Sequence, residues 1–163
     1  MLNRFICILF IYVCISIVCV IPAYSQDDQI VWGAGIGSGD SYGTRMLSLG
    51  IQEDLWYALK QRGTVGGWFD PTGNGRSSSV LASGQLGFEV NSRGTVVSIF
   101  TGPCLISTPD SYLGGYFQFM TDAHIGLQDN DVNYLGVFYR HISSAGIENP
   151  NVGRDIMGLE LKF

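Results

Sequence analysis

The segment from Arg140 to Asp155 contains the residue types of a nucleophilic hydrolase. His141 and Ser143 are two positions apart near the end of an expected strand, and side chains at i and i+2 of a strand project from the same face. Asp155 begins the next expected strand, so its carboxylate can reach His141 if the two strands form a hairpin. A serine nucleophile, a histidine base and an orienting carboxylate make up the triad of serine hydrolases. We therefore predict an esterase site formed by Ser143, His141 and Asp155.

Eight segments that would position this site alternate between apolar and polar residues with the two-residue period of a β-strand. In the fourth segment, for example, Val80 and Phe88 fall on one face and Gln85 and Glu89 on the other. The expected strands cover approximately residues 29–38, 44–57, 63–70, 78–91, 95–106, 113–128, 132–143 and 155–163. Apolar-out, polar-in strands of about ten residues are typical of a transmembrane β-barrel, although a soluble sandwich or a lipocalin-like barrel shows the same alternation.

The connections between these segments favour the membrane barrel. Long polar connections at residues 71–77, 102–112 and 144–154 alternate with short turns at 92–94 and 129–131. Outer-membrane barrels combine long external loops with short periplasmic turns in the same way.

The last segment supports the same fold. Apolar residues occupy every second position from Met157 to the terminal Phe163. This pattern resembles the C-terminal strand that the outer-membrane assembly machinery recognises, so we expect that machinery to be a partner through Phe163. Together these features predict an all-β fold, an eight-stranded antiparallel transmembrane β-barrel.

The N-terminal residues have the pattern of a signal peptide. Arg4 supplies a positive charge, residues 5–21 form an apolar run, and residues 23–25 (Ala-Tyr-Ser) provide a small-x-small cleavage site. We predict a signal peptide over residues 1–25 and an outer-membrane barrel domain over residues 26–163. The alternative is a retained membrane anchor, because the apolar run is about long enough to span a bilayer.

The composition argues against nucleic-acid binding and provides no disulfide to stabilise the domain. The chain has 9 Lys and Arg against 14 Asp and Glu residues and no basic patch, which argues against nucleic-acid binding. Beyond the predicted signal peptide Cys104 is the lone cysteine, so no internal disulfide is expected, and closure of a barrel in a membrane would stabilise the domain instead. We predict neither a metal nor a cofactor, and we expect His124 and Arg140 to face a polar barrel interior.

Strand parity predicts that the triad lies on the outside of the barrel. Val137 and Tyr139 share a face with His141 and Ser143, and the apolar positions of the last strand share a face with Asp155. With both termini in the periplasm, the loop ends of these strands lie at the outer leaflet. The triad would there face glycolipid head groups and the ester bonds of their acyl chains, away from the hydrocarbon centre where ionisable groups are costly.

The same segment resembles the PagL-type lipid A 3-O-deacylases, a family of Gram-negative outer-membrane esterases. That family carries a His-x-Ser-Asn-Ala-Gly sequence, then Pro-Asn-x-Gly, then a glutamate just beyond. The corresponding residues here are His141-Ile142-Ser143-Ser144-Ala145-Gly146, Pro150-Asn151-Val152-Gly153 and Asp155. The eight strands, the signal peptide and the terminal phenylalanine extend the likeness more loosely over the whole chain.

The resemblance implies a role for each matched residue. His141 falls on the family's base and Ser143 on its nucleophile, while Gly146 and Asn151 fall on positions associated with the oxyanion hole. It also implies that the substrate is lipid A in the outer-membrane lipid, and that the reaction removes the 3-O-linked hydroxyacyl chain.

Two residues depart from the family's pattern. Ser144 replaces the asparagine after the nucleophile, and Asp155 replaces the glutamate, whose side chain is one methylene longer. These departures keep open a non-catalytic eight-stranded barrel, of the adhesin or membrane-tethering kind, in which the triad has decayed. A second alternative is an outer-membrane phospholipase, which would share the site chemistry but act on glycerophospholipids.

Overall fold

The computed structural model describes residues 28–38, 41–70, 78–129 and 133–163. The predicted signal peptide, the connection at 71–77 and most of the turn at 129–131 lie outside the described residues, so these assignments stay predictions. Within the described ranges, no helix is long and apolar enough to cross a membrane.

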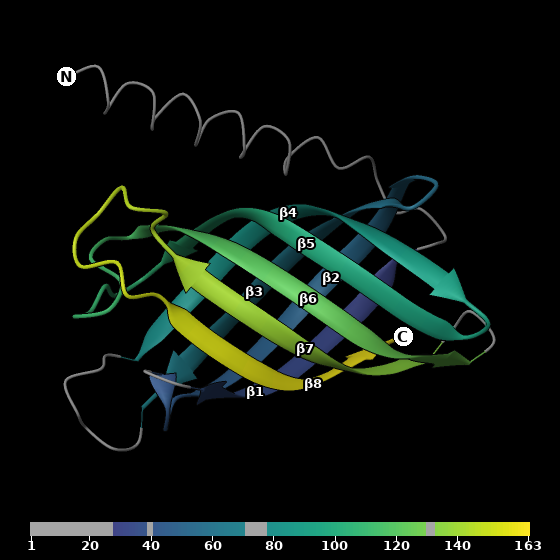
Figure 1. The fold of residues 1–163 in the computed structure, drawn as a ribbon, viewed down its shortest axis with the longest axis horizontal. Helices are drawn as coiled ribbons and strands as arrows, with labels where there is room; N and C mark the ends of the chain where they lie inside the picture. The colour runs from purple at the N-terminus through teal and green to yellow at the C-terminus, as the bar shows by residue number, and fades with distance from the viewer. Residues whose placement is uncertain (1–27, 39–40, 71–77, 130–132) are drawn as a thin grey trace.

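Eight antiparallel strands form a closed barrel, in which each strand pairs with the next and the last pairs with the first (Figure 1). The strands are β1 (Gln29–Ser38), β2 (Arg45–Trp56), β3 (Leu59–Phe69), β4 (Ser79–Ser92), β5 (Thr95–Ile106), β6 (Phe117–Asp129), β7 (Asn133–Ser143) and β8 (Arg154–Lys162). The predicted all-β fold and strand number are confirmed. In Figure 1 the β7–β8 loop lies at one end of the barrel and the C-terminus lies toward the other.

Two strands begin four residues away from the predicted positions, while the other starts agree to within one residue. β3 begins at Leu59, because a two-residue turn at Tyr57 (φ 46°) and Ala58 sends the chain straight back from β2. The polar residues at the start of β3 have partners within the sheet: Lys60 forms an ion pair with Asp54. β6 begins at Phe117, because the preceding segment folds against the β7–β8 loop instead of extending the strand.

The two faces of the barrel have the predicted polarity. Large apolar side chains are exposed on the outside of every strand, as at Trp32, Leu47, Ile99 and Leu159. Charged side chains are buried inside, and they include Arg62, Asp122, His124, Arg140, Glu160 and Lys162. A soluble domain has the opposite arrangement, so this polarity is typical of a barrel that spans a membrane.

The charges in the interior are paired. Arg140 donates hydrogen bonds of 2.8 and 2.7 Å to the two carboxylate oxygens of Asp122. Arg62 Nη1 lies 2.9 Å from Glu160 Oε2, and His124 Nδ1 lies 3.2 Å from the same oxygen. Removing one partner of such a buried pair is costly, since it leaves an uncompensated charge. Arg140 and His124 therefore belong to the interior network, as the sequence predicts.

At the loop end, Arg154 ties separate elements together from inside the barrel. Its Nη1 donates to Thr44 Oγ1 at 2.8 Å, and its Nη2 forms an ion pair with Asp110 of the β5–β6 loop. Its guanidinium also lies 5.2 Å from the centre of the Trp68 ring. Because neighbouring residues of a strand point to opposite faces, this inward anchor fixes the start of β8 while Asp155 points outward.

Candidate active site

The register of β7 and β8 places His141 directly opposite Asp155. Both side chains point outward, and His141 Nδ1 lies 2.8 Å from Asp155 Oδ1. Their side chains are 40% and 39% exposed respectively, so a molecule at the outer surface of the barrel can reach them. Two of the three predicted triad residues are thus in contact.

Ser143 lies on the same outward face at the end of β7, opposite Phe119 of β6, and it is half-buried. Within the part of the chain that the structure describes, no hydrogen bond joins Ser143 to His141. Since Nδ1 of His141 is engaged by Asp155, Nε2 is the ring nitrogen that remains for a nucleophile. Such base–nucleophile contacts are often long without substrate and tighten when it binds.

Gly153 lies against the imidazole of His141. Its φ of 82° is in the left-handed region that favours glycine. A Cβ at this position would lie 2.8 Å from Cε1 and 3.3 Å from Nε2 of His141. The ring can therefore hold its orientation only with glycine here. The Pro-Asn-x-Gly spacing contains this glycine, but the sequence alone gave no reason to connect it with His141.

Asp155 has two further contacts that the sequence analysis missed. Tyr139 Oη donates a hydrogen bond of 2.5 Å to Asp155 Oδ1. The backbone N–H of Asp155 donates to Oγ of the buried Ser41 at 3.1 Å. Parity alone assigned Tyr139 to the lipid side, and no local pattern connects Ser41, more than a hundred residues away, with Asp155.

Ser144, the first departure from the motif, stabilises the β7–β8 loop. Its side chain is buried, Oγ donates to the backbone oxygen of Glu148 at 3.1 Å, and the backbone N–H of Glu148 lies 3.3 Å from the same Oγ. A hydroxyl serves as donor and acceptor at once. The serine therefore turns into the loop and not toward His141.

Asn151 is held in a defined orientation within this loop. Its Oδ1 accepts a hydrogen bond of 2.7 Å from the backbone N–H of Ser144. Because a backbone N–H requires an acceptor, the side-chain NH₂ of Asn151 is left as a donor. The position is fixed by the β5–β6 loop, since Leu113 forms a bridge with Asn151 and Tyr112 O accepts from Val152 N at 3.1 Å.

Gly146 occupies a tight turn in the same loop. Ala145 and Gly146 both have positive φ, 52° and 80°, and Ile147 N donates to Ser144 O at 3.0 Å across the turn. A Cβ at position 146 would meet nothing within 4 Å, so this glycine faces open space. The structure thus places both predicted oxyanion residues in one loop that follows Ser143.

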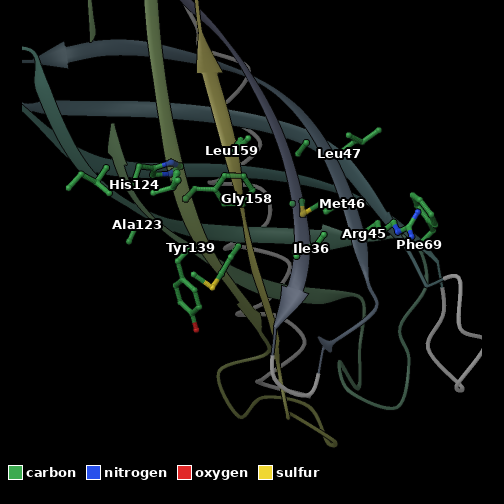
Figure 2. Close-up of a pocket in the computed structure, with 16 residues that line it drawn as sticks. Ile36, Arg45, Met46, Leu47, Phe69, Ala123, His124, Tyr139, Gly158 and Leu159 are labelled. Carbon is green, nitrogen blue, oxygen red and sulfur yellow. The ribbon is translucent and has the colours of Figure 1, made fainter. Parts of the chain in front are cut away.

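An apolar groove of about 970 Å³ crosses the outward face below His141 and Asp155. Tyr139 lies at one side of it, and Arg45 and Phe69, which are partners across β2 and β3, lie at the other (Figure 2). The small residue Ala34 lies between Leu159 and Leu47 in the strand register, which lowers the wall there. On its other side the groove begins at Tyr139 and Met157, the next outward-facing pair after His141 and Asp155.

No group of three or more His, Cys, Asp or Glu side chains among the described residues is suited to hold a metal ion. The single cysteine of the described residues, Cys104, is buried in β5.

Comparison with known proteins relates this geometry to a family. The crystal structure of the outer membrane enzyme PagL superposes with a TM-score of 0.63 at 20% identity, covering 83% of this chain and 98% of that one. A de novo designed transmembrane β-barrel (TM-score 0.57, 14% identity, 86% of this chain and 98% of that one) has the same fold. The Yersinia pestis outer membrane protein Ail also has this fold, with a TM-score of 0.53 at 12% identity, covering 85% of this chain and 100% of that one.

No curated protein matches the sequence significantly. The family model described as lipid A 3-O-deacylase (PagL) matches residues 41–163. The chain therefore belongs to the lipid A 3-O-deacylase (PagL) family.

Proposed function

We propose that this protein is a serine esterase of the Gram-negative outer membrane that removes the 3-O-linked hydroxyacyl chain of lipid A. The observation that carries the proposal is the contact between His141 and Asp155 on the lipid-facing side of the barrel, in a chain that belongs to a family of lipid A deacylases. The reaction needs neither a metal nor a cofactor.

In the proposed reaction, Ser143 Oγ attacks the ester carbonyl and His141 Nε2 takes its proton. Asp155 orients the imidazole and stabilises the imidazolium that forms. His141 then gives the proton to the leaving alcohol of the sugar, which leaves the acyl chain on Ser143. A water molecule, activated by His141, cleaves this second ester, releases the fatty acid and restores the serine.

The oxyanion of each tetrahedral intermediate requires donors that are already in place. We assign this role to the side-chain NH₂ of Asn151 and the backbone N–H of Gly146. The bond between Asn151 Oδ1 and Ser144 N supports the assignment, because it engages the oxygen of the amide and leaves the NH₂ group as a donor. The two hydrogen bonds of Ser144 with Glu148 support it as well, since they hold the turn that contains Gly146.

The groove supports a lipid substrate. Its apolar walls suit an acyl chain, and it begins at Tyr139 and Met157, directly beside the proposed triad. Arg45 adds a guanidinium at the far edge (Figure 2), and guanidinium groups bind the phosphates of a glycolipid head group well. The same outward surface supports a multi-pass location in the outer membrane, with lipid as its surroundings.

The decisive experiment is a mass spectrum of lipid A from Gram-negative cells that express this chain. Loss of one hydroxyacyl group is expected, and cells expressing Ser143→Ala at the same barrel level should retain it. Unchanged lipid A together with new lysophospholipids would replace the proposal with the phospholipase. Unchanged lipids of both kinds, with a folded barrel in the membrane, would identify the non-catalytic barrel.

A further inference from the structure

Asp155 presents its carboxylate at the outer surface of the barrel, where its side chain is 39% exposed. Rotation about the Cβ–Cγ bond would turn both carboxylate oxygens relative to the imidazole of His141. An orienting carboxylate is useful only if one oxygen stays directed at the imidazole N–H. The short aspartate side chain therefore needs a neighbour that holds the carboxylate in plane with the ring.

Tyr139 is placed to do this. It precedes His141 by two residues on the outward face of β7, and its direct partner on β8 is Met157. Asp155 is therefore its diagonal neighbour, a separation that an aromatic side chain can span. Figure 2 shows the Tyr139 ring extending away from the β7 ribbon with its hydroxyl at the far end.

Two donors converge on the same carboxylate oxygen. Tyr139 Oη donates to Asp155 Oδ1 at 2.5 Å, and His141 Nδ1 lies 2.8 Å from that oxygen. A second donor fixes the carboxylate plane that the histidine alone would leave free to turn. The tyrosine ring meanwhile forms part of the apolar groove wall, so one residue serves the lipid side and the polar site together.

We infer that Tyr139 is a positioning residue of the proposed triad: its hydroxyl holds the carboxylate of Asp155 against His141. The inference rests on the proposed esterase function. Tyrosines also anchor membrane barrels at the interface with water, but that role requires only a ring and an exposed hydroxyl. A hydroxyl that acts through Asp155 affects turnover, and its effect depends on which carboxylate stands at position 155.

The first test compares Tyr139→Phe with the wild type in purified, folded barrel acting on lipid A. Loss of one hydrogen bond to a charged group should lower kcat about tenfold, with KM within about twofold because the ring still lines the groove. Tyr116→Phe is the matched control, since Tyr116 is an exposed tyrosine near the same end of the barrel. A Tyr139→Phe enzyme with wild-type kcat would overturn the inference.

The second test repeats the substitution in an Asp155→Glu background. A longer carboxylate reaches the imidazole without the support of Tyr139, so Tyr139→Phe should there change kcat by less than about twofold. An equal loss in both backgrounds would mean that the hydroxyl does not act through residue 155, and would also overturn the inference.

The Ser143→Ala variant separates this inference from the proposed function. Turnover by Ser143→Ala, or none by the wild type, removes the triad and the role of Tyr139 with it. An inactive Ser143→Ala enzyme beside a fully active Tyr139→Phe enzyme keeps the proposed function and rejects the positioning role alone.

Discussion

The contact between His141 and Asp155 decides which part of the imidazole is available for chemistry. With Nδ1 facing the carboxylate, that nitrogen carries the proton and Nε2 is left to accept one from a nucleophile, which is the tautomer that a triad requires. Aspartate provides this contact without the longer reach of glutamate because β7 and β8 place the two residues directly opposite each other.

Asp155→Asn should keep the shape of the site and remove the charge that the imidazolium needs. The same change in another triad lowers kcat by about 10⁴-fold, and we expect a loss approaching that size. Asp155→Glu should keep most of the activity, because it retains the charge with a longer reach. Rates would be measured on folded protein at one detergent-to-substrate ratio. A rate within a few-fold of wild type for Asp155→Asn would reduce the triad to a Ser143–His141 dyad.

Gly153→Ala should lower kcat by displacing the imidazole of His141. The new methyl group would stand 2.8 Å from Cε1, and the left-handed backbone adds a strain of about 1–2 kcal/mol. Gly94→Ala provides the control, because Gly94 has nearly the same φ, 81°, in the β4–β5 turn. Both variants should lose similar thermal stability, and only Gly153→Ala should lose turnover. Equal activities would show that Gly153 does not position His141.

At the scale of elements, the β7–β8 loop is held by parts of the chain that are distant in sequence. The β5–β6 loop contributes Leu113, which bridges to Asn151, and Tyr112, whose carbonyl accepts hydrogen bonds from the backbone of Val152 and Gly153. From the β1–β2 connection, Ser41 binds the backbone of Asp155. Three connections therefore define the site, and β7 and β8 alone would leave the loop without support.

The apolar groove extends from β6 across β7, β8, β1 and β2 to β3, and it leads to a prediction about the acyl chain. Ala34→Leu adds a bulky side chain to the groove wall between Leu159 and Leu47. We expect kcat/KM for a long-chain substrate to fall at least about tenfold, since a few methylene groups in an apolar pocket discriminate to that extent. Ala82→Leu on β4 is the control, because Ala82 is also an exposed alanine on the outward face. Equal turnover by the two variants would exclude this groove as the acyl site.

At the scale of the whole molecule, interior ion pairs and the closure of the sheet hold the eight strands together. The buried pairs Arg140–Asp122 and Arg62–Glu160 fill the interior, while apolar side chains face outward into lipid. Closure leaves no free strand edge, because the backbones of Phe163 and Ile30 exchange hydrogen bonds of 3.0 Å at the seam of β8 and β1.

Two variants of Phe163 can distinguish its role in closing the barrel from its role in recognition by the assembly machinery. Deleting it removes both backbone bonds with Ile30, whereas Phe163→Ala keeps them and removes only the exposed ring. If the assembly machinery reads the ring, both variants should accumulate less in the outer membrane on fractionation. The inserted fraction should keep its specific activity, because the residue lies far from the loop end. Normal insertion of both variants would remove Phe163 as the recognised feature.

The strand pattern and the faces of the barrel were determined by the sequence itself. Residues 29–38 and 95–106 were predicted with the observed bounds of β1 and β5. The outward placement of His141, Ser143 and Asp155 followed as well. These features depend on the two-residue period of a strand, which is a local property of the backbone.

The tertiary structure decided how these side chains are held. The contacts of Tyr139 with Asp155, Gly153 with His141, and Ser41 with the start of β8 join residues that no spacing relates. The strand predicted to begin at Leu113 begins at Phe117 for the same reason, because Leu113 bridges to Asn151 instead. Such contacts depend on the register and closure of all eight strands, and a period of two residues excludes a slip of one residue between neighbouring strands but does not distinguish a slip of two.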